Sequence, residues 1–314
     1  MPDSPKSQAA PQQFDILLFD QFSNHCLANT VEPLRAANTL SQRTLYTWRF
    51  CTMDGQTVRS SSGMEVTPHG ALGDTWGGSL VVMPSYGVRA LDHGDVIRPL
   101  ARALKRYDTL IGMDTGSWLL ARAGALNGRR ATIHWDVLDS FAEAFPDIDT
   151  VRNRFVVDGA RLTCSGAMAA FDLVAHLISE HHGPLLALEV GQLFMSPEAT
   201  SRPLNTPIRA GRTVTRAIAI MQAHLDQPIA ISTLAHSLGC TQKTLEARVR
   251  DAMQMTPQAL YRRLRLNHAL ALLQDTDQPI SEIAGRCGYE TPSALSRAFR
   301  ATFDQTPSAV RGAA

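Results

Sequence analysis

Asp114 is the residue whose sequence surroundings most suggest chemistry. It lies in the segment IGMDTGS, where an apolar run ending at Met113 meets a helical pattern, and Gly112 and Gly116 flank it. Glycines at this spacing indicate a sharp turn from strand to helix. The first N–H groups of a helix and its dipole favour a negative charge at such a turn. Asp114 is therefore expected either to bind a ligand or simply to cap the helix.

A second group of candidate residues lies in residues 213–314, which contain an internal repeat. At an offset of 49, the residues Ser232, Leu234, Ala235 and Gly239 match Ser281, Ile283, Ala284 and Gly288; at an offset of 50, Thr256-Pro257 matches Thr306-Pro307. Each copy predicts a helix, a turn with glycine, and a second helix rich in arginine. The expected helices are 231–238 and 242–253 in the first copy and 280–287 and 292–303 in the second. This pattern favours two helix-turn-helix motifs over an ordinary six-helix bundle.

Residues 14–196 predict an α/β domain that positions Asp114. Strands are expected at 14–19, 46–53, 79–84 and 109–113, a hairpin at 154–166, and helices at 31–40, 96–107, 167–182 and 185–194. This alternation predicts a flavodoxin-like, mostly parallel sheet with helices on both faces. An all-α domain with the two helix-turn-helix motifs should follow at 213–314. Residues 1–13 are interpreted as a disordered arm and 197–212 as a linker, because both lack apolar periodicity.

Composition excludes several classes of protein. With 314 residues the chain is about twice the ~150 residues typical of one domain. Hydrophobic residues make up 44% and charged residues 19%, which excludes general disorder. No apolar run reaches the ~18–20 residues that cross a bilayer, and the N-terminus does not resemble a secretory signal. Five scattered cysteines without a CxxC pair argue against a disulfide scaffold or metal site and favour a reducing cytoplasm; no cofactor is expected.

The charges are distributed unevenly along the chain. The whole sequence has a net charge of +1, but residues 212–314 hold 12 Lys and Arg against 8 Asp and Glu, a net +4, which leaves −3 for residues 1–211. A basic tail on an acidic body predicts a polyanion as the partner of the tail.

The tail resembles the DNA-binding domain of the AraC/XylS-type transcription regulators. The segment ISEIAGRCGYETPSALSRAFRATFDQTPSAVR carries the likeness, with LYRRLRLNHALALL before it as the connecting helix. Two reading helices on one connecting helix can enter successive major grooves of double-stranded DNA, about 34 Å apart. By position, the residues expected to face bases are Gln242, Lys243, Glu246, Glu290, Ser293 and Arg297, and those expected to hold phosphates are Arg250 and Arg300.

The first domain resembles the class I glutamine amidotransferase-like fold, in the version that is fused to AraC-type tails. The likeness rests on VEPLRAAN (31–38), VVMPSYG (81–87), IGMDTGSWLLARAGALNGRRATIHW (111–135) and TCSGAMAAFDLVAHLI (163–178). In catalytic relatives the residue at the sharp strand-to-helix turn, called the elbow, is a Cys nucleophile with a lowered pKa. Here Asp114 takes that position, and Glu32 stands where relatives place an acid beside the Cys. The resemblance implies that the catalysis is lost and the pocket is kept.

The predicted pocket combines acids with aromatic rings. The residues expected to bind a ligand are Glu32, Ser85, Tyr86, Asp114, Thr115, Trp118, His134 and Trp135. Acidic groups and aromatic faces suit an ammonium or quaternary-ammonium group. The resemblance likewise implies a small zwitterionic or cationic metabolite, because relatives with a DTG elbow respond to amino-acid or betaine-like compounds. Trp118 could instead belong to the core, and His134 could be an ordinary half-buried histidine.

These observations predict a ligand-responsive, sequence-specific transcription regulator that activates a catabolic operon. RNA polymerase is an expected partner, and homodimerisation through the first domain would pair two half-sites. Two alternatives remain. One is a cysteine hydrolase or deglycase-like enzyme with a DNA-binding tail, whose candidate nucleophile is Cys26 in the loop after the first strand. The other is a repressor whose first domain serves only for dimerisation.

Overall fold

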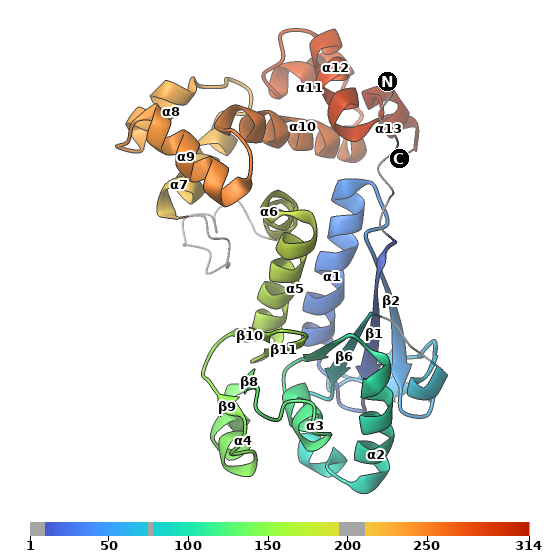
Figure 1. Cartoon of the computed structure of the whole chain (residues 1–314). Coiled ribbons are helices and arrows are strands. Elements are labelled where there is room, and N and C mark those ends of the chain that lie inside the picture. The colour runs from blue at the N-terminus through green and yellow to red at the C-terminus, as the bar shows by residue number, and fades with distance from the viewer. Residues whose placement is uncertain (1–9, 75–77, 195–210, 314) are drawn as a thin grey trace, which may run out of the picture. The chain divides into compact units, whose positions relative to one another are not determined.

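The computed structural model describes residues 10–74, 78–194 and 211–313. Most of the predicted N-terminal arm and nearly all of the predicted linker, 197–210, lie outside these residues. The chain divides into two compact units, Met1–Ile178 and Ser179–Ala314 (Figure 1). The predicted domain limits remain a prediction.

Unit 1 is built on a seven-stranded sheet in the order β10-β11-β7-β6-β1-β2-β5. Every neighbouring pair is parallel except β10 and β11, which form the predicted antiparallel hairpin. The strands are β1 (Gln12–Leu18), β2 (Tyr46–Thr52), β5 (Gly70–Ala71), β6 (Ser79–Met83), β7 (Thr109–Gly112), β10 (Phe155–Asp158) and β11 (Arg161–Cys164). The predicted α/β class is confirmed.

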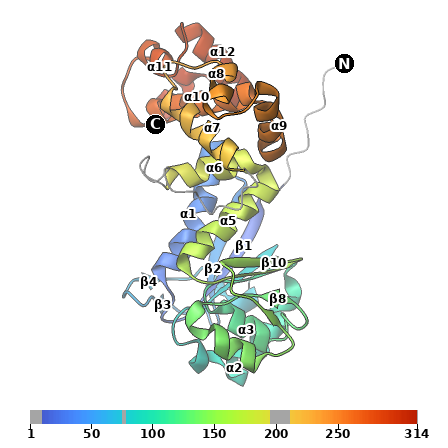
Figure 2. The same cartoon turned by 90° about the vertical axis from the view of Figure 1, so that its left-hand side faces the viewer.

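Helices cover both faces of this sheet. They are α1 (Asn24–Ser41), α2 (Gly94–Ala103), α3 (Gly116–Arg122), α4 (Leu138–Ala144) and α5 (Ala167–His182), with 3-10 turns at Leu72–Asp74, Val88–Leu91, Leu104–Arg106 and Trp135–Val137. Successive strand residues point to opposite faces. Leu17 and Val82 therefore pack into the core that α2 and α3 complete. Ile16 and Val81 point to the other face, where α1 and α5 lie side by side (Figures 1 and 2).

Several elements of unit 1 differ from the predictions. Helix α1 begins at Asn24, seven residues before the predicted start, because Ser23 caps it by accepting a hydrogen bond from the N–H of Cys26 at 3.2 Å. Cys26 therefore lies in the first turn of a helix and not in a loop. Strand β1 begins at Gln12 rather than Phe14. Two short strand pairs were not predicted: β3 (Val58–Arg59) with β4 (Glu65–Val66), and β8 (Arg130–Ala131) with β9 (Asp149–Thr150).

Unit 2 is helical and contains both predicted motifs. Its helices are α6 (Pro184–Leu193), α7 (Arg212–Ala223), α8 (Ile231–Ser237), α9 (Gln242–Met253), α10 (Pro257–Asp275), α11 (Ile280–Arg286), α12 (Pro292–Phe303) and α13 (Pro307–Ala313). The pairs α8–α9 and α11–α12 are the two helix-turn-helix motifs. Gly239 and Gly288 adopt φ angles of +67° and +68° at their turns, as the repeat predicted.

The repeat extends to the helix caps. Thr241 and Thr291 accept hydrogen bonds from the N–H groups of Thr244 and Ala294 at the starts of α9 and α12, both at 3.2 Å. Each copy encloses its own hydrophobic core, and α10 contributes to both. Leu188 of α6 belongs to the first of these cores. In the described ranges, no helix is long and apolar enough to cross a membrane.

Candidate functional site

The elbow after β7 is forced by two close backbone approaches. A Cβ atom on Gly116 would lie 2.0 Å from the carbonyl oxygen of Val82, and one on Gly112 would lie 2.8 Å from the backbone nitrogen of Ser117. Only glycine fits at either place. Between them Asp114 has a φ of +60°, an uncommon conformation for a residue with a side chain. Strain of this kind concentrates at functional sites.

The side chain of Asp114 is enclosed by neighbours from other strand ends. Asp114 is 9% exposed. Burial raises the pKa of its carboxyl, an effect to which the negative charge of Asp136 adds, while the charge of His134 and the hydroxyl of Ser85 lower it. The N-cap residue of α3 is Thr115, whose hydroxyl donates to the carbonyl of Ser85 at 2.5 Å rather than capping the helix. A buried carboxylate is thus held at the carboxyl ends of the strands, where open α/β sheets bind ligands.

Ser85 has unused hydrogen-bonding capacity beside this carboxylate. It is 4% exposed and has a φ of +53°. Its hydroxyl lies close enough to influence the pKa of Asp114, but it is not aligned in a regular hydrogen bond with any group in the described residues. Such an unfilled polar atom is costly when buried. A bound polar ligand could satisfy it.

Two exposed aromatic rings follow these residues in the sequence. Tyr86, next to Ser85, is 61% exposed, and Trp135, next to His134, is 66% exposed. The rings of His134 and Trp135 lie 5.5 Å apart. Each exposed ring offers an apolar face and a polar group to a partner molecule.

Two of the predicted ligand residues, Trp118 and Glu32, have contacts of their own. Trp118 is 1% exposed, donates from Nε1 to Asp92 at 2.9 Å, and lies under the guanidinium of Arg89 at 3.7 Å. It packs in the core of unit 1 and does not line an open site. Glu32 is half-exposed and pairs with Arg35 at 2.7 Å, and it is not among the charges that shift the pKa of Asp114. The expectation for Trp118 is corrected, because packing in the core occupies its side chain. Glu32 stays a predicted ligand residue.

Two thiols that the sequence did not place at the elbow lie near it. Cys26 is fully buried, and its pKa is raised well above the usual value by burial and by neighbouring Cys164 and Asp114. Burial likewise raises the pKa of Cys164 to about 11. Burial therefore disfavours the thiolate form of both side chains. They were missed because their proximity arises from separate elements, α1 and β11.

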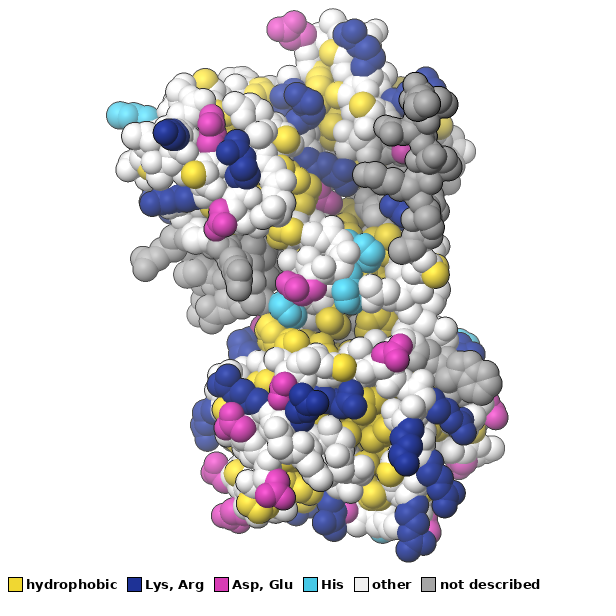
Figure 3. All heavy atoms as spheres, viewed as in Figure 1, with side chains coloured by type: hydrophobic (Ala, Val, Ile, Leu, Met, Phe, Trp, Pro, Cys, Tyr) yellow, Lys and Arg dark blue, Asp and Glu magenta, His cyan; other side chains and the backbone are white. Residues whose placement is uncertain are grey.

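The predicted DNA-facing residues lie on the surface of unit 2. On α9, Gln242, Lys243 and Arg250 are exposed, while Glu246 is partly covered and accepts a hydrogen bond from Gln242 at 2.8 Å. The residues predicted in the second motif are all exposed: Glu290, Ser293, Arg297 and Arg300. Figure 3 shows basic side chains over unit 2 interspersed with acidic and uncharged ones, in line with its modest net charge.

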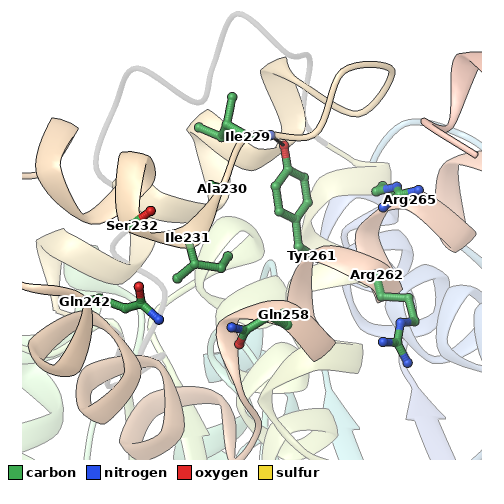
Figure 4. A pocket seen from close by; sticks show the side chains of 9 residues that line it. All are labelled: Ile229, Ala230, Ile231, Ser232, Gln242, Gln258, Tyr261, Arg262 and Arg265. Atoms are coloured by element: carbon green, nitrogen blue, oxygen red, sulfur yellow. Dashed lines mark hydrogen bonds between the residues drawn. The ribbon is translucent and has the colours of Figure 1, made fainter.

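A polar cavity of about 500 Å³ lies among α8, α9 and α10. Figure 4 shows the residues that line it: Ile229, Ala230, Ile231, Ser232, Gln242, Gln258, Tyr261, Arg262 and Arg265. Its charged lining residues are both arginines. Arg262 is exposed and makes neither an ion pair nor a hydrogen bond with the described part of the chain. The sequence analysis did not single out this arginine, although the run YRRLR was a signal for it.

Models of two protein families match this chain. A model of the DJ-1/PfpI family matches residues 16–180, and a model described as a helix-turn-helix domain matches residues 234–313. The HTH-type transcriptional regulator CdhR of Pseudomonas aeruginosa is 36% identical over 309 residues, which cover 95% of this chain and 90% of CdhR. The chain belongs to the DJ-1/PfpI family and is an HTH-type transcriptional regulator.

Other similarities agree with this assignment. The regulator is 32% identical to the HTH-type transcriptional regulator GlxA of Rhizobium meliloti, over 96% of this chain and 95% of GlxA. A solved AraC family regulator from Pseudomonas putida has a TM-score of 0.50 at 24% identity, over 59% of this chain and 100% of that one. A ThiJ/PfpI family protein from Pseudomonas syringae has a TM-score of 0.51 at 20% identity, over 71% and 93% of the two chains. These two structures support the fold alone.

Proposed function

We propose that the regulator binds a small cationic or zwitterionic metabolite at Asp114 and that this binding controls transcription. The observation that carries the proposal is a buried carboxylate of raised pKa beside a buried hydroxyl without a regular partner. The proposed ligand-binding residues are Ser85, Tyr86, Asp114, Thr115, His134 and Trp135.

The chemistry of this site favours a cation. An ammonium or quaternary-ammonium group beside Asp114 would stabilise the charged carboxylate and so return its pKa toward the usual value. The exposed rings of Tyr86 and Trp135 offer cation–π contacts. The Ser85 hydroxyl and the imidazole of His134 could bind the carboxylate of a zwitterion. Amino acids and betaine- or carnitine-like compounds have this combination of groups.

In this proposal, the two helix-turn-helix motifs bind DNA. We propose that Gln242, Lys243 and Glu246 contact bases from α9, that Glu290, Ser293 and Arg297 do so from α12, and that Arg250 and Arg300 hold phosphates. We further propose that the regulator acts as a homodimer in the cytoplasm and activates a catabolic operon through RNA polymerase.

A hydrolase with an appended DNA-binding tail is disfavoured. Its nucleophile would have to be Cys26, which is fully buried and has a raised pKa. The relatives are regulators, and Asp114 at the elbow is a much weaker nucleophile toward acyl groups than a thiolate.

Calorimetric titration of the full chain tests the ligand proposal. The panel should contain glycine betaine, carnitine, choline and several amino acids, with uncharged isosteres as controls. We expect at least one cationic or zwitterionic compound to bind, and Asp114→Asn to weaken it at least about thirtyfold, because a desolvated cation would lose its partner. Thr39→Ala, on the exposed side of α1, is a matched control and should bind normally. Equal binding by Asp114→Asn would locate the ligand elsewhere, and no binding by any compound would favour a first domain that only dimerises.

A further inference from the structure

The two reading motifs of unit 2 do not share a hydrophobic core. Leu260, Tyr261 and Leu264 of α10 belong to the first core, while Leu266 and Leu270 of the same helix belong to the second. The change from one core to the other occurs at Arg265. The relative orientation of the motifs therefore depends on α10 and on the contacts made at this junction.

Arg265 reaches from α10 to the turn of the second motif. Its Nε donates to the carbonyl of Cys287 and its terminal nitrogen to the carbonyl of Gly288, both at 2.6 Å. The guanidinium lies 4.2 Å from the centre of the Tyr289 ring. Two parallel charge-assisted hydrogen bonds and a stacked ring fix the guanidinium in direction as well as in position.

Gly288 packs the same turn against the loop that precedes the first motif. A Cβ atom on Gly288 would lie 2.7 Å from both the carbonyl oxygen of Leu225 and the ring of Pro228, in the loop between α7 and α8. The matching glycine of the first copy, Gly239, has nearly the same φ but no atom within 4 Å of its added Cβ. The two copies thus differ at this contact, where the second motif meets the loop that precedes the first motif.

We propose that Arg265 and Gly288 form a clamp that fixes α12 relative to α9. The clamp thereby sets the spacing between two subsites, the groups of base pairs that α9 and α12 read within the half-site of one chain. The proposal rests on the proposed reading of DNA by both helices. Inserting one base pair between the subsites moves the α12 subsite by about 3.4 Å and turns it by roughly 35° relative to the α9 subsite. A rigid pair of motifs cannot follow this change, whereas a loosely joined pair keeps a high effective concentration over several spacings.

The test uses the full-length regulator and a duplex selected by it from a random library. Affinity is measured for this duplex, for versions with one base pair inserted or removed between the α9 and α12 subsites, and for each subsite alone. Wild type should lose about tenfold or more on a one-base-pair insertion. Arg265→Lys keeps the positive charge but cannot donate two parallel hydrogen bonds as the guanidinium does. Its loss of affinity on insertion should therefore shrink to about threefold or less. Its affinity for each subsite alone should stay unchanged.

The control is Arg216→Lys, the same substitution at an exposed arginine of α7. It should retain the wild-type dependence on spacing. If Arg265→Lys depends on spacing as wild type does, the clamp is contradicted. An equal loss of affinity on every duplex would also contradict it, because that result would show a role in folding only. If wild type itself prefers no sequence, the proposed DNA reading fails, and the clamp fails with it.

A second pair of variants probes the other half of the clamp. Gly288→Ala and Gly239→Ala introduce similar backbone strain, but only the former meets neighbouring atoms. We expect Gly288→Ala to flatten or shift the spacing profile and Gly239→Ala to leave it unchanged. Identical profiles for the two variants would contradict the proposal.

Discussion

The backbone N–H of His134 donates a hydrogen bond to the backbone carbonyl of Asp114 at 3.1 Å. The segment that follows β8 is thereby tied to the elbow that follows β7. A ligand that displaces Asp114 would also displace His134 and, next to it, the exposed ring of Trp135. The site therefore joins a buried charge to the surface through one backbone contact.

Replacing Asp114 by Asn should stabilise unit 1 at neutral pH. Burial raises the pKa of the Asp114 carboxyl in the folded protein. The stability contributed by this group is therefore full below the unfolded pKa, near 4, and is lost as the pH rises through the folded pKa. The variant should unfold at higher urea than wild type at pH 7.5, with the difference shrinking toward pH 4. All four tryptophans lie in residues 1–178, so their fluorescence reports on this unit. A variant less stable than wild type at pH 7.5 would contradict this prediction.

Replacing Gly116 by Ala should destabilise unit 1. The added Cβ would lie 2.0 Å from the Val82 carbonyl oxygen, so the elbow must shift. We expect a loss of about 2–3 kcal/mol in the free energy of unfolding, measured by urea titration of tryptophan fluorescence. Gly73→Ala is the control, since its Cβ would have nothing within 4 Å, and it should change stability by less than about 0.5 kcal/mol. Similar losses for the two variants would mean that the elbow is not closely packed.

Arg297→Ala should weaken binding to specific DNA by about 1–3 kcal/mol, because a base contact is lost, and should leave binding to random DNA nearly unchanged. Gel-shift titrations on selected and random duplexes measure both affinities. Arg300→Ala, which removes a proposed phosphate contact one turn later, should weaken both equally. Equal losses for Arg297→Ala would assign Arg297 to the phosphates instead.

Arg262→Gln should lower DNA affinity on every sequence and reduce the slope of log affinity against log salt by about 0.9, as expected for one lost phosphate contact. The prediction follows from the exposed, unpaired guanidinium at a cavity that also contains Gln242 of a reading helix. Arg248→Gln serves as the control, because Arg248 is engaged with Thr213 of α7 at 2.7 Å. An unchanged slope for Arg262→Gln would remove this arginine from the DNA interface.

Arg263→Gln should destabilise unit 2 at neutral pH by about 3 kcal/mol, because it leaves the buried carboxylate of Glu189 without its partner. Glu189 is 3% exposed and lies 3.2 Å from Arg263. Burial raises its pKa and Arg263 lowers it, so removing Arg263 raises it further. The destabilisation should therefore be small below pH 5 and grow as the pH rises. Unfolding followed by circular dichroism measures it, and the double variant with Glu189→Gln should recover much of the loss at pH 7.

Features that depend on local geometry can be predicted from the sequence alone. A helix-turn-helix needs a periodic apolar face and a residue of positive φ, and both are visible within about twenty residues at Gly239 and Gly288. The elbow at Asp114 is visible for the same reason, since Gly112 and Gly116 mark the close approaches that create it. The alternation of strands and helices likewise sufficed for the α/β class.

Contacts between side chains from distant segments depend on the tertiary structure. Trp118 had a suitable type and position for a ligand site, but it packs in the core. Cys26 and Cys164 approach Asp114 from α1 and β11, more than 130 residues apart in sequence. Arg265 joins the second motif through carbonyl groups, which are present at every residue and leave no mark in the sequence. Contacts between distant segments depend on how the elements pack in three dimensions, and no local pattern of residue types encodes that packing.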